Sequence, residues 1–322
     1  MTTTEVLNAL TSKGIISNKQ ADTIHSFEAD KAFSIHWELR SILYLGILLF
    51  TSGLGILIYE NIDTIGHQAI IALIAILMVI CFWYTYKHRV PFSLDEVHNP
   101  NKFVSYTLLI GCMLFLALEG YLQFQYTLFG TKYGAAVLLP TLLFFVTAYR
   151  FDHTGVLSMA ITGLASWLGL TIAPLSVIAK SDFTDGRLVW SATLLGVLLV
   201  AFAWISNLKS WKAHFANTYL LLGGNLAFIA TLAGAFTMEP LFVFFLFGIT
   251  LAVFFILSAR RVHSLLFLLM GIVYGYVHVT YLLAKLVGNE LVFGLATVYF
   301  TFSSIGVILF LLNYKKFLGI KR

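Results

Sequence analysis

The sequence predicts an all-α polytopic membrane protein with about ten spans, and three observations predict this fold class. Of the 322 residues, 59% are hydrophobic and only 11% are charged, whereas soluble domains carry about 45–50% apolar and about 25% charged residues. The apolar residues form runs of about 20, the length of helix that crosses a ~30 Å bilayer core. The basic residues lie in short clusters between these runs, which indicates membrane orientation and argues against a nucleic-acid partner.

The first 40 residues differ from the rest in being mostly polar, and residues 1–40 are predicted to form a cytoplasmic helical leader. A first helix is expected to end at Gly14, because glycine is typical of helix C-termini. Ser17 and Gln20 then fit a capping box that opens a second helix. We therefore predict that residues 2–31 form a short helical hairpin. This hairpin is the part of the chain most suited to binding a protein partner.

The membrane domain is expected to occupy the rest of the chain, 41–322. Its spans must be helices, because lipid cannot form hydrogen bonds with the exposed backbone N–H and C=O groups of an open strand. The ten apolar runs are 41–59, 67–86, 103–122, 131–149, 155–178, 188–206, 216–236, 240–258, 264–286 and 293–312.

The orientation follows from the distribution of lysine and arginine between the loops. With ten spans, sixteen of the 20 basic residues fall on the side that holds both termini, and four fall on the other. Cytoplasmic loops carry the excess of basic residues. Both termini are therefore predicted to be cytoplasmic, and the lipid bilayer is the partner that the composition requires.

The ninth span carries the most informative polar residues, because Tyr274, His278 and Tyr281 recur at helical spacing and share one face. One interpretation is a seam between helices, in which Gly271 and Gly275 allow close approach. The other is the wall of a cavity, in which His278 carries a proton or contacts a ligand. All three polar residues are candidate substrate-binding residues.

Three further candidates lie in other spans. Glu119 and Gln123 are four residues apart at the outer end of the third span and share a face. Glu119 is either a solvated carboxylate at the membrane interface or an inward-pointing group able to exchange protons. Asn225 lies deep in the seventh span, where it either bridges two helices or marks a locally unwound helix that lines a site.

The motifs of soluble enzymes are absent from the sequence, including Walker A, His-Glu-x-x-His and Gly-x-Ser-x-Gly. We therefore predict no catalytic residue, no metal site and no cofactor. Asp152 and His153 are adjacent in a predicted inner loop and could contact a metal or a lipid headgroup. We interpret them as a solvated turn.

Two stretches resemble a bacterial family of predicted membrane proteins, the domain-of-unknown-function 2157 family. These stretches are VLNALTSKGIISNKQADTI at 6–24 and LEGYLQFQYTLFGTKYGAAVLLP at 118–140. Gln125-Tyr126 and Leu139-Pro140 match the family pattern, whereas its glycine-glutamine pair is not reproduced. The resemblance covers the leader and the first half of the membrane region. It implies a protein of the bacterial inner membrane, and it implies no particular activity.

Three functions compete on these observations. A transporter or permease for a small solute or a lipid is favoured by the many spans and the polar face of the ninth span. A non-transporting scaffold or sensor would use the leader to bind a partner. An intramembrane enzyme on lipid-linked substrates is the least favoured, because it needs converging ionisable groups that no motif supplies. The oligomeric state is not predicted.

Overall fold

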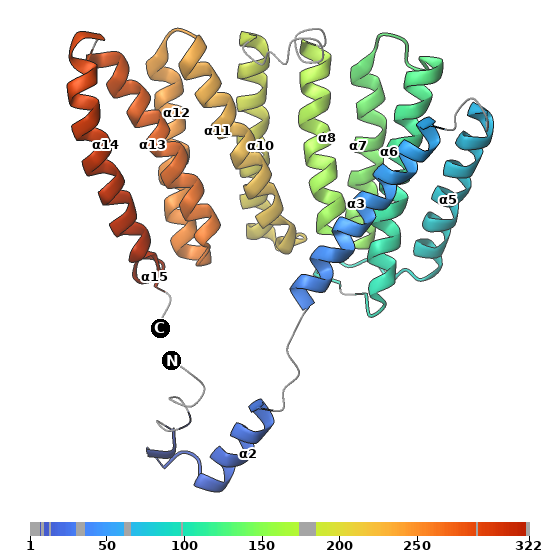
Figure 1. Cartoon of the computed structure of the whole chain (residues 1–322), viewed down its shortest axis with the longest axis horizontal. Helices are drawn as coiled ribbons and strands as arrows, with labels where there is room; N and C mark the ends of the chain where they lie inside the picture. The colour runs from blue at the N-terminus through green and yellow to red at the C-terminus, as the bar shows by residue number, and fades with distance from the viewer. Residues whose placement is uncertain are drawn as a thin grey trace. The chain divides into compact units, whose positions relative to one another are not determined.

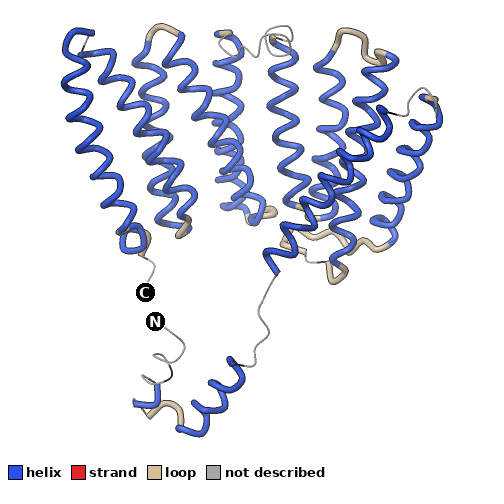
Figure 2. Tube along the Cα trace, viewed as in Figure 1, coloured by secondary structure: helices blue, strands red, loops and turns tan. Residues whose placement is uncertain are grey.

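The computed structural model describes residues 7, 10–12, 14–29, 36–60, 66–97, 99–173, 185–287 and 289–319. Within these residues the chain is built from helices and loops (Figure 2). The chain divides into two compact units, Met1–Phe50 with Ile320–Arg322, and Thr51–Gly319. We describe each unit by itself.

The first unit contains the leader helix α2 (Asn18–Ala29). Its capping box is formed as predicted, since the Ser17 amide donates to Gln20 Oε1 at 2.9 Å and the Gln20 amide donates to Ser17 Oγ at 3.3 Å. The preceding turn contains Gly14 at φ +67°, a left-handed conformation that glycine adopts without strain. The predicted helix end at Gly14 is thus confirmed, whereas most of the hairpin before residue 10 lies outside the described residues.

The second unit contains the membrane helices. Helix α3 (His36–Glu60) runs through the division between the two units. The helices that follow it are α5 (His67–Lys87), α6 (Lys102–Tyr126), α7 (Tyr133–Phe151), α8 (Thr154–Ile172), α10 (Gly186–Lys209), η1 (Ala213–Phe215), α11 (Ala216–Thr237), α12 (Leu241–Val262), α13 (Leu265–Val287), α14 (Asn289–Leu312) and α15 (Tyr314–Phe317) (Figure 1).

The fold class is confirmed as a polytopic helical membrane protein. Within the described residues, eight helices are long and apolar enough to cross a bilayer. They are α5 to α8 and α10 to α13, and α3 and α14 correspond to the first and tenth predicted spans. The largest difference is in the fifth span, which was predicted to reach residue 178, whereas α8 ends at Ile172. Residues 174–184, which include Pro174, lie outside the described part.

The second unit is organised in consecutive antiparallel helix pairs. The most extensive packing joins α5 to α6, α7 to α8, α10 to α11 and α12 to α13 (Figure 1). The largest apolar core lies between α6 to α8 and α10 to α13, and it includes Leu157, Phe215 and Phe255, all fully buried. The pairs are therefore the basic packing units of this part of the chain.

One end of the second unit carries most of its basic residues, and we call this end the basic face. Helices α5, α7, α10 and α12 end there, and their last turns contain Lys87, Arg150, Lys209 and Arg260, respectively. Lys87 Nζ lies 5.0 Å from the centre of the Trp83 ring. Such pairs of cationic and aromatic side chains are typical of a membrane–water interface.

Candidate functional site

The predicted polar face of α13 lies in a packed seam between α11, α12 and α13. Tyr274 donates its hydroxyl to Asn225 Oδ1 on α11 at 2.9 Å. A Cβ at Gly271 would lie 2.7 Å from Ile256 on α12, and a Cβ at Gly275 would lie 3.0 Å from Ala252. The two glycines therefore permit the close approach of α12 and α13, which is the geometry of the seam interpretation.

His278 is enclosed in this seam, with 2% of its surface exposed. Its Nδ1 lies 2.8 Å from the carbonyl oxygen of Tyr274, one turn earlier on its own helix. Its Nε2 is buried and has no hydrogen-bond partner among the described residues. The ring lies against Gly248 of α12, where an added Cβ would be 2.1 Å from Nε2. The imidazole thus occupies the space that glycine leaves free.

Asn225 bridges two helices, as one of the two predictions for it requires. Besides accepting from Tyr274, it donates through Nδ2 to the Leu221 carbonyl at 2.7 Å. Helix α11 continues from Ala216 to Thr237, so the alternative of a locally unwound helix at Asn225 is wrong. Tyr281 lies farther along α13, with its ring centre 4.5 Å from that of Phe236 on α11.

Glu119 and Gln123 lie on α6 and have different surroundings. Glu119 has 7% of its surface exposed, and its Oε1 is buried with no hydrogen-bond partner in the described part of the chain. This placement corresponds to the inward-pointing alternative. Gln123 Nε2 donates to the Gly130 carbonyl at 2.9 Å, and its Oε1 accepts from the Phe129 amide at 2.9 Å. Gln123 therefore holds the loop between α6 and α7.

The six candidates do not form one site. Tyr274, His278 and Asn225 lie in one seam, whereas no hydrogen bond among the described residues joins them to Glu119 or Gln123 on α6. A role in binding substrate stays a prediction for all six residues.

An apolar cleft of about 500 Å³ lies between α8, α10 and α11 in the second unit. Its lining comes from residues 162–170 of α8, 188–192 of α10 and 226–233 of α11. These segments belong to the helix ends opposite the basic face. Among the described residues, the lining contains no charged and no aromatic side chain, and one lining residue, Ile229, is 57% exposed.

None of the six predicted residues lines this cleft, nor do they line two smaller cavities. One of these, of about 440 Å³, is bordered by Phe145, Phe202 and Tyr219. The other, of about 20 Å³, lies at the basic face beside Arg150, Asp152 and Lys212 and has room for about one water molecule.

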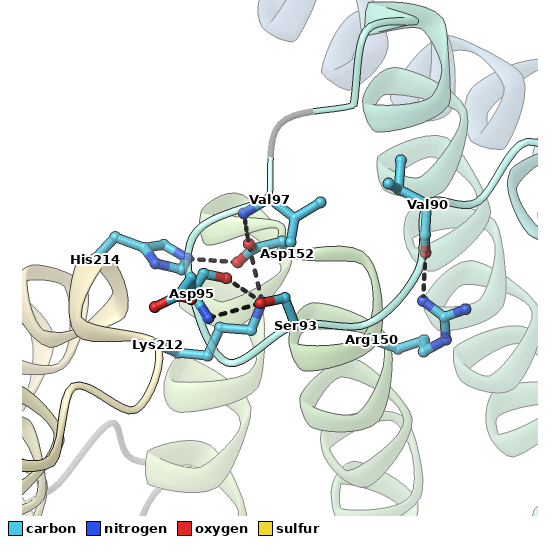
Figure 3. A network of polar contacts seen from close by, with 8 residues as sticks. All are labelled: Val90, Ser93, Asp95, Val97, Arg150, Asp152, Lys212 and His214. Atoms are coloured by element: carbon cyan, nitrogen blue, oxygen red, sulfur yellow. Dashed lines mark hydrogen bonds and ion pairs between the residues drawn. The ribbon is translucent and has the colours of Figure 1, made fainter.

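A buried charged cluster lies at the basic face, and the sequence interpretation missed it (Figure 3). Asp152 Oδ2 lies 2.9 Å from Lys212 Nζ, and their side chains are 4% and 2% exposed. His214 Nε2 pairs with Asp152 Oδ1, and the Val97 amide donates to Oδ2. We call Asp152, Lys212, His214 and the backbone of residues 94–97 the Asp152 cluster.

The cluster joins three loops. Lys212 Nζ donates to the Asp95 carbonyl at 3.3 Å, and the Lys212 amide donates to the Leu94 carbonyl at 2.8 Å. Next to it, Arg150 donates to the Val90 carbonyl at 3.1 Å. The loop between α5 and α6 is therefore held by Arg150 in the last turn of α7 and by residues that follow α7 and α10.

The interpretation of Asp152 and His153 as a solvated turn is wrong. Asp152 ends α7 at φ +57°, a left-handed conformation that aspartate adopts more readily than most residues. His153 is 6% exposed, and its Nδ1 accepts from the Val156 amide at 3.1 Å, which caps α8. The sequence contains no spacing that would pair Asp152 with Lys212, because the two residues follow different helices.

The comparison with protein families agrees with the resemblance seen in the sequence. The model of the family described as "Predicted membrane protein (DUF2157)" matches residues 8–157. No curated protein and no solved structure matches the chain. The matched range includes all of 118–140 and nearly all of 6–24. The resemblance of this chain to the domain-of-unknown-function 2157 family of predicted membrane proteins is therefore confirmed over residues 8–157.

Proposed function

We propose that this membrane protein is a permease for a lipid or a lipid-like molecule, which it holds by an acyl chain in the apolar cleft between α8, α10 and α11. The observation that carries the proposal is the cleft itself. Its volume of about 500 Å³ lies within the range of about 300–1,000 Å³ that is usual for ligand sites.

The dimensions of the cleft support an acyl chain. Residues 162–170 of α8 extend about 12 Å at 1.5 Å per residue, close to the depth of about 15 Å of one leaflet of the bilayer core. Leu168, Leu226 and Ile229 supply aliphatic contacts, and Ser166 satisfies its hydroxyl within its own helix by donating to the Thr162 carbonyl at 3.0 Å.

The same geometry favours a lipid over a small polar solute. A polar solute needs side chains that replace its hydrogen bonds to water. Among the described residues, Asn225 and Tyr274 lie outside the cleft and pair with one another in a packed seam. The cleft offers contacts that suit hydrocarbon.

We further propose that the protein lies in a bacterial inner membrane with its basic face and both termini in the cytoplasm. The support is the sixteen-to-four distribution of lysine and arginine that ten spans produce. Single-cysteine accessibility to a membrane-impermeant maleimide tests this orientation. Cysteine introduced at Asn207 is expected to be protected in intact cells, and cysteine at Lys132 is expected to react.

The test of function is movement of lipid across vesicles that contain the purified protein. The vesicles hold equimolar phosphatidylethanolamine and phosphatidylglycerol with a trace of fluorescent lipid, and dithionite is added outside. Without lipid movement, dithionite bleaches about half of the label, because only the outer leaflet is reached. With an active permease, nearly all of the label is expected to be lost.

Filling the cleft provides the matched comparison. Ala165→Trp and Ala192→Trp place an indole among the lining residues of α8 and α10, and each is expected to slow bleaching of the inner leaflet at least tenfold. Ala117→Trp on α6 makes the same change at an exposed position outside the cleft and is expected to have no effect. A wild-type protein that leaves half of the label intact would reject the permease.

Binding is measured separately with a lipid that carries a photoreactive diazirine in its acyl chain. Labelled peptides are expected from α8 and α11, and the label is expected to disappear in Ala165→Trp. Labelling of the cleft without lipid movement would mean that the protein binds lipid but does not transport it, and would reject the permease.

A scaffold or sensor is the second candidate, and one observation favours it. The leader belongs to a separate compact unit, in which Ile15 and Ile24 are 65% and 40% exposed. Apolar side chains exposed on a short helix and on the turn before it are suited to a protein partner. Deletion of residues 1–31 is expected to abolish a cellular phenotype of the full chain if this candidate is correct. A phenotype that survives the deletion would reject it.

A further inference from the structure

The helices that line the apolar cleft belong to two closely packed pairs. In the α7–α8 pair, a Cβ at Gly163 would lie 2.3 Å from Thr141 Oγ1. In the α10–α11 pair, a Cβ at Gly196 would lie 2.6 Å from the Ala227 backbone nitrogen. Neither contact leaves room for a larger residue, so each pair is expected to move as one body.

The two pairs are joined differently at their two ends. Near the basic face, Leu157 of α8, Ala203 of α10 and Phe215 of η1 are fully buried in one apolar core. At the opposite end, the same helices are separated by the apolar cleft of about 500 Å³. Contact between the pairs is therefore concentrated toward one end of the helices.

The Asp152 cluster lies at the joined end. Asp152 ends α7 and lies two residues before α8, whereas Lys212 and His214 lie in the connection from α10 to α11. The carboxylate accepts from Lys212, His214 and Val97. The Asp152 and Lys212 side chains are nearly closed to water, whereas His214 is 16% exposed. Separating the two pairs at this end would expose an ion pair that is satisfied only while they touch.

We propose that the Asp152 cluster is the pivot about which the α7–α8 pair moves against the α10–α11 pair to admit an acyl chain at the opposite end. This inference rests on the proposed function, because it concerns the regulation of the same cleft. Closure of a site between two rigid bodies about a fixed contact is a known form of conformational change. Lys212 and Asp152 are positioning residues in this mechanism and do not touch the lipid.

The experiment measures two distances between spin labels, in a chain with Cys81 and Cys112 replaced by alanine. One pair of labels, at Ala135→Cys on α7 and Thr237→Cys on α11, reports the end that contains the cleft. The other pair, at Thr154→Cys and Ala213→Cys, reports the pivot. All four positions are exposed. Each distance is measured in lipid-free detergent and again after transfer to equimolar phosphatidylethanolamine and phosphatidylglycerol.

Lipid is expected to shift the 135–237 distance while the 154–213 distance keeps a single narrow distribution. No variant of the cluster is needed for this result, so it does not depend on whether such a variant folds. An unchanged 135–237 distance, or equal shifts at both ends, would overturn the pivot.

Asp152→Asn provides the second measurement. It is expected to broaden the 154–213 distribution and to reduce photolabelling of the cleft severalfold, whereas Asp152→Glu is expected to restore part of both. A narrow 154–213 distribution in folded Asp152→Asn would also overturn the proposal. The two proposals can fail separately. If lipid moves across the vesicles but the spin-label distances do not change, only the pivot is rejected. If the 135–237 distance shifts but no lipid moves, only the permease is rejected.

Discussion

The carboxylate of Asp152 and the ammonium group of Lys212 lie 2.9 Å apart, with side chains that are only 4% and 2% exposed. Each follows a different membrane helix, so the pair joins two loops that are distant in sequence. A buried ion pair is costly to separate, because the desolvation of each charge is offset only by the other. The contribution of this ion pair to stability can be tested by replacing either residue.

Asp152→Asn and Lys212→Met are each expected to lower the free energy of unfolding by about 3–5 kcal/mol, because each removes one partner of a buried ion pair. The double variant is expected to lose less free energy of unfolding than the sum of the losses in the two single variants. Unfolding in mixed detergent micelles, followed by tryptophan fluorescence, measures all three. Arg187→Met is the control, since Arg187 is 79% exposed in its pair with Asp185 and is expected to contribute nothing measurable. Equal losses in Asp152→Asn and Arg187→Met would contradict the prediction.

Gly248→Ala tests the placement of His278. The added methyl group would lie 2.1 Å from Nε2, and overpacking of this kind costs about 1–3 kcal/mol of stability. The midpoint of thermal unfolding is the measurement. Gly306→Ala on α14 makes the same change where nothing lies within 4 Å, and it is expected to be neutral or slightly stabilising. A Gly248→Ala protein as stable as Gly306→Ala would show that the imidazole lies elsewhere.

Tyr274→Phe tests the polar link between α11 and α13. The change removes the donor to Asn225 Oδ1 in a partly buried hydrogen bond, and losing such a bond costs about 0.5–1.5 kcal/mol. Combining it with Asn225→Leu is expected to recover part of that loss, because neither polar group then remains alone. Denaturant titration of the two single variants and the double variant gives the coupling energy. Strict additivity would mean that the two side chains do not interact.

Gln123→Leu is expected to release the loop between α6 and α7. The carboxamide makes two backbone hydrogen bonds, to Gly130 and Phe129, and without them the loop opens locally at a lower free energy. Amide hydrogen exchange at Phe129 is expected to become at least tenfold faster. Gln125→Leu changes an exposed glutamine of the same helix and is expected to leave exchange unchanged, so faster exchange in both variants would argue against a specific role for Gln123.

The sequence was sufficient to predict the membrane helices, because each span needs about 20 apolar residues whatever its partners are. The seventh span, predicted at 216–236, is observed as Ala216–Thr237. Local hydrogen bonding was also predicted from the sequence, as the capping box from Ser17 to Gln20 shows. Both features depend only on residues that are near one another in sequence.

The charged cluster and the cleft could not be predicted in this way. Lys212 lies in a group of basic residues, and the orientation rule accounts for such residues without any partner. Its pairing with Asp152 exists only because the loops after α7 and α10 meet at the basic face. The cleft is likewise a consequence of how α8 packs on α10 and α11, which helical periodicity does not specify.

The position of Asp152 before Lys212 in the chain also bears on how the protein is assembled during synthesis. Translation proceeds from the N-terminus and domains form as the chain emerges, so the α7–α8 pair is made before Lys212 and His214. Its carboxylate remains without those partners until α10 has crossed the membrane and the chain has turned at Trp211. In chains that stop before this turn, the carboxylate of Asp152 therefore lacks both side-chain partners and keeps only the backbone amide of Val97 as a donor.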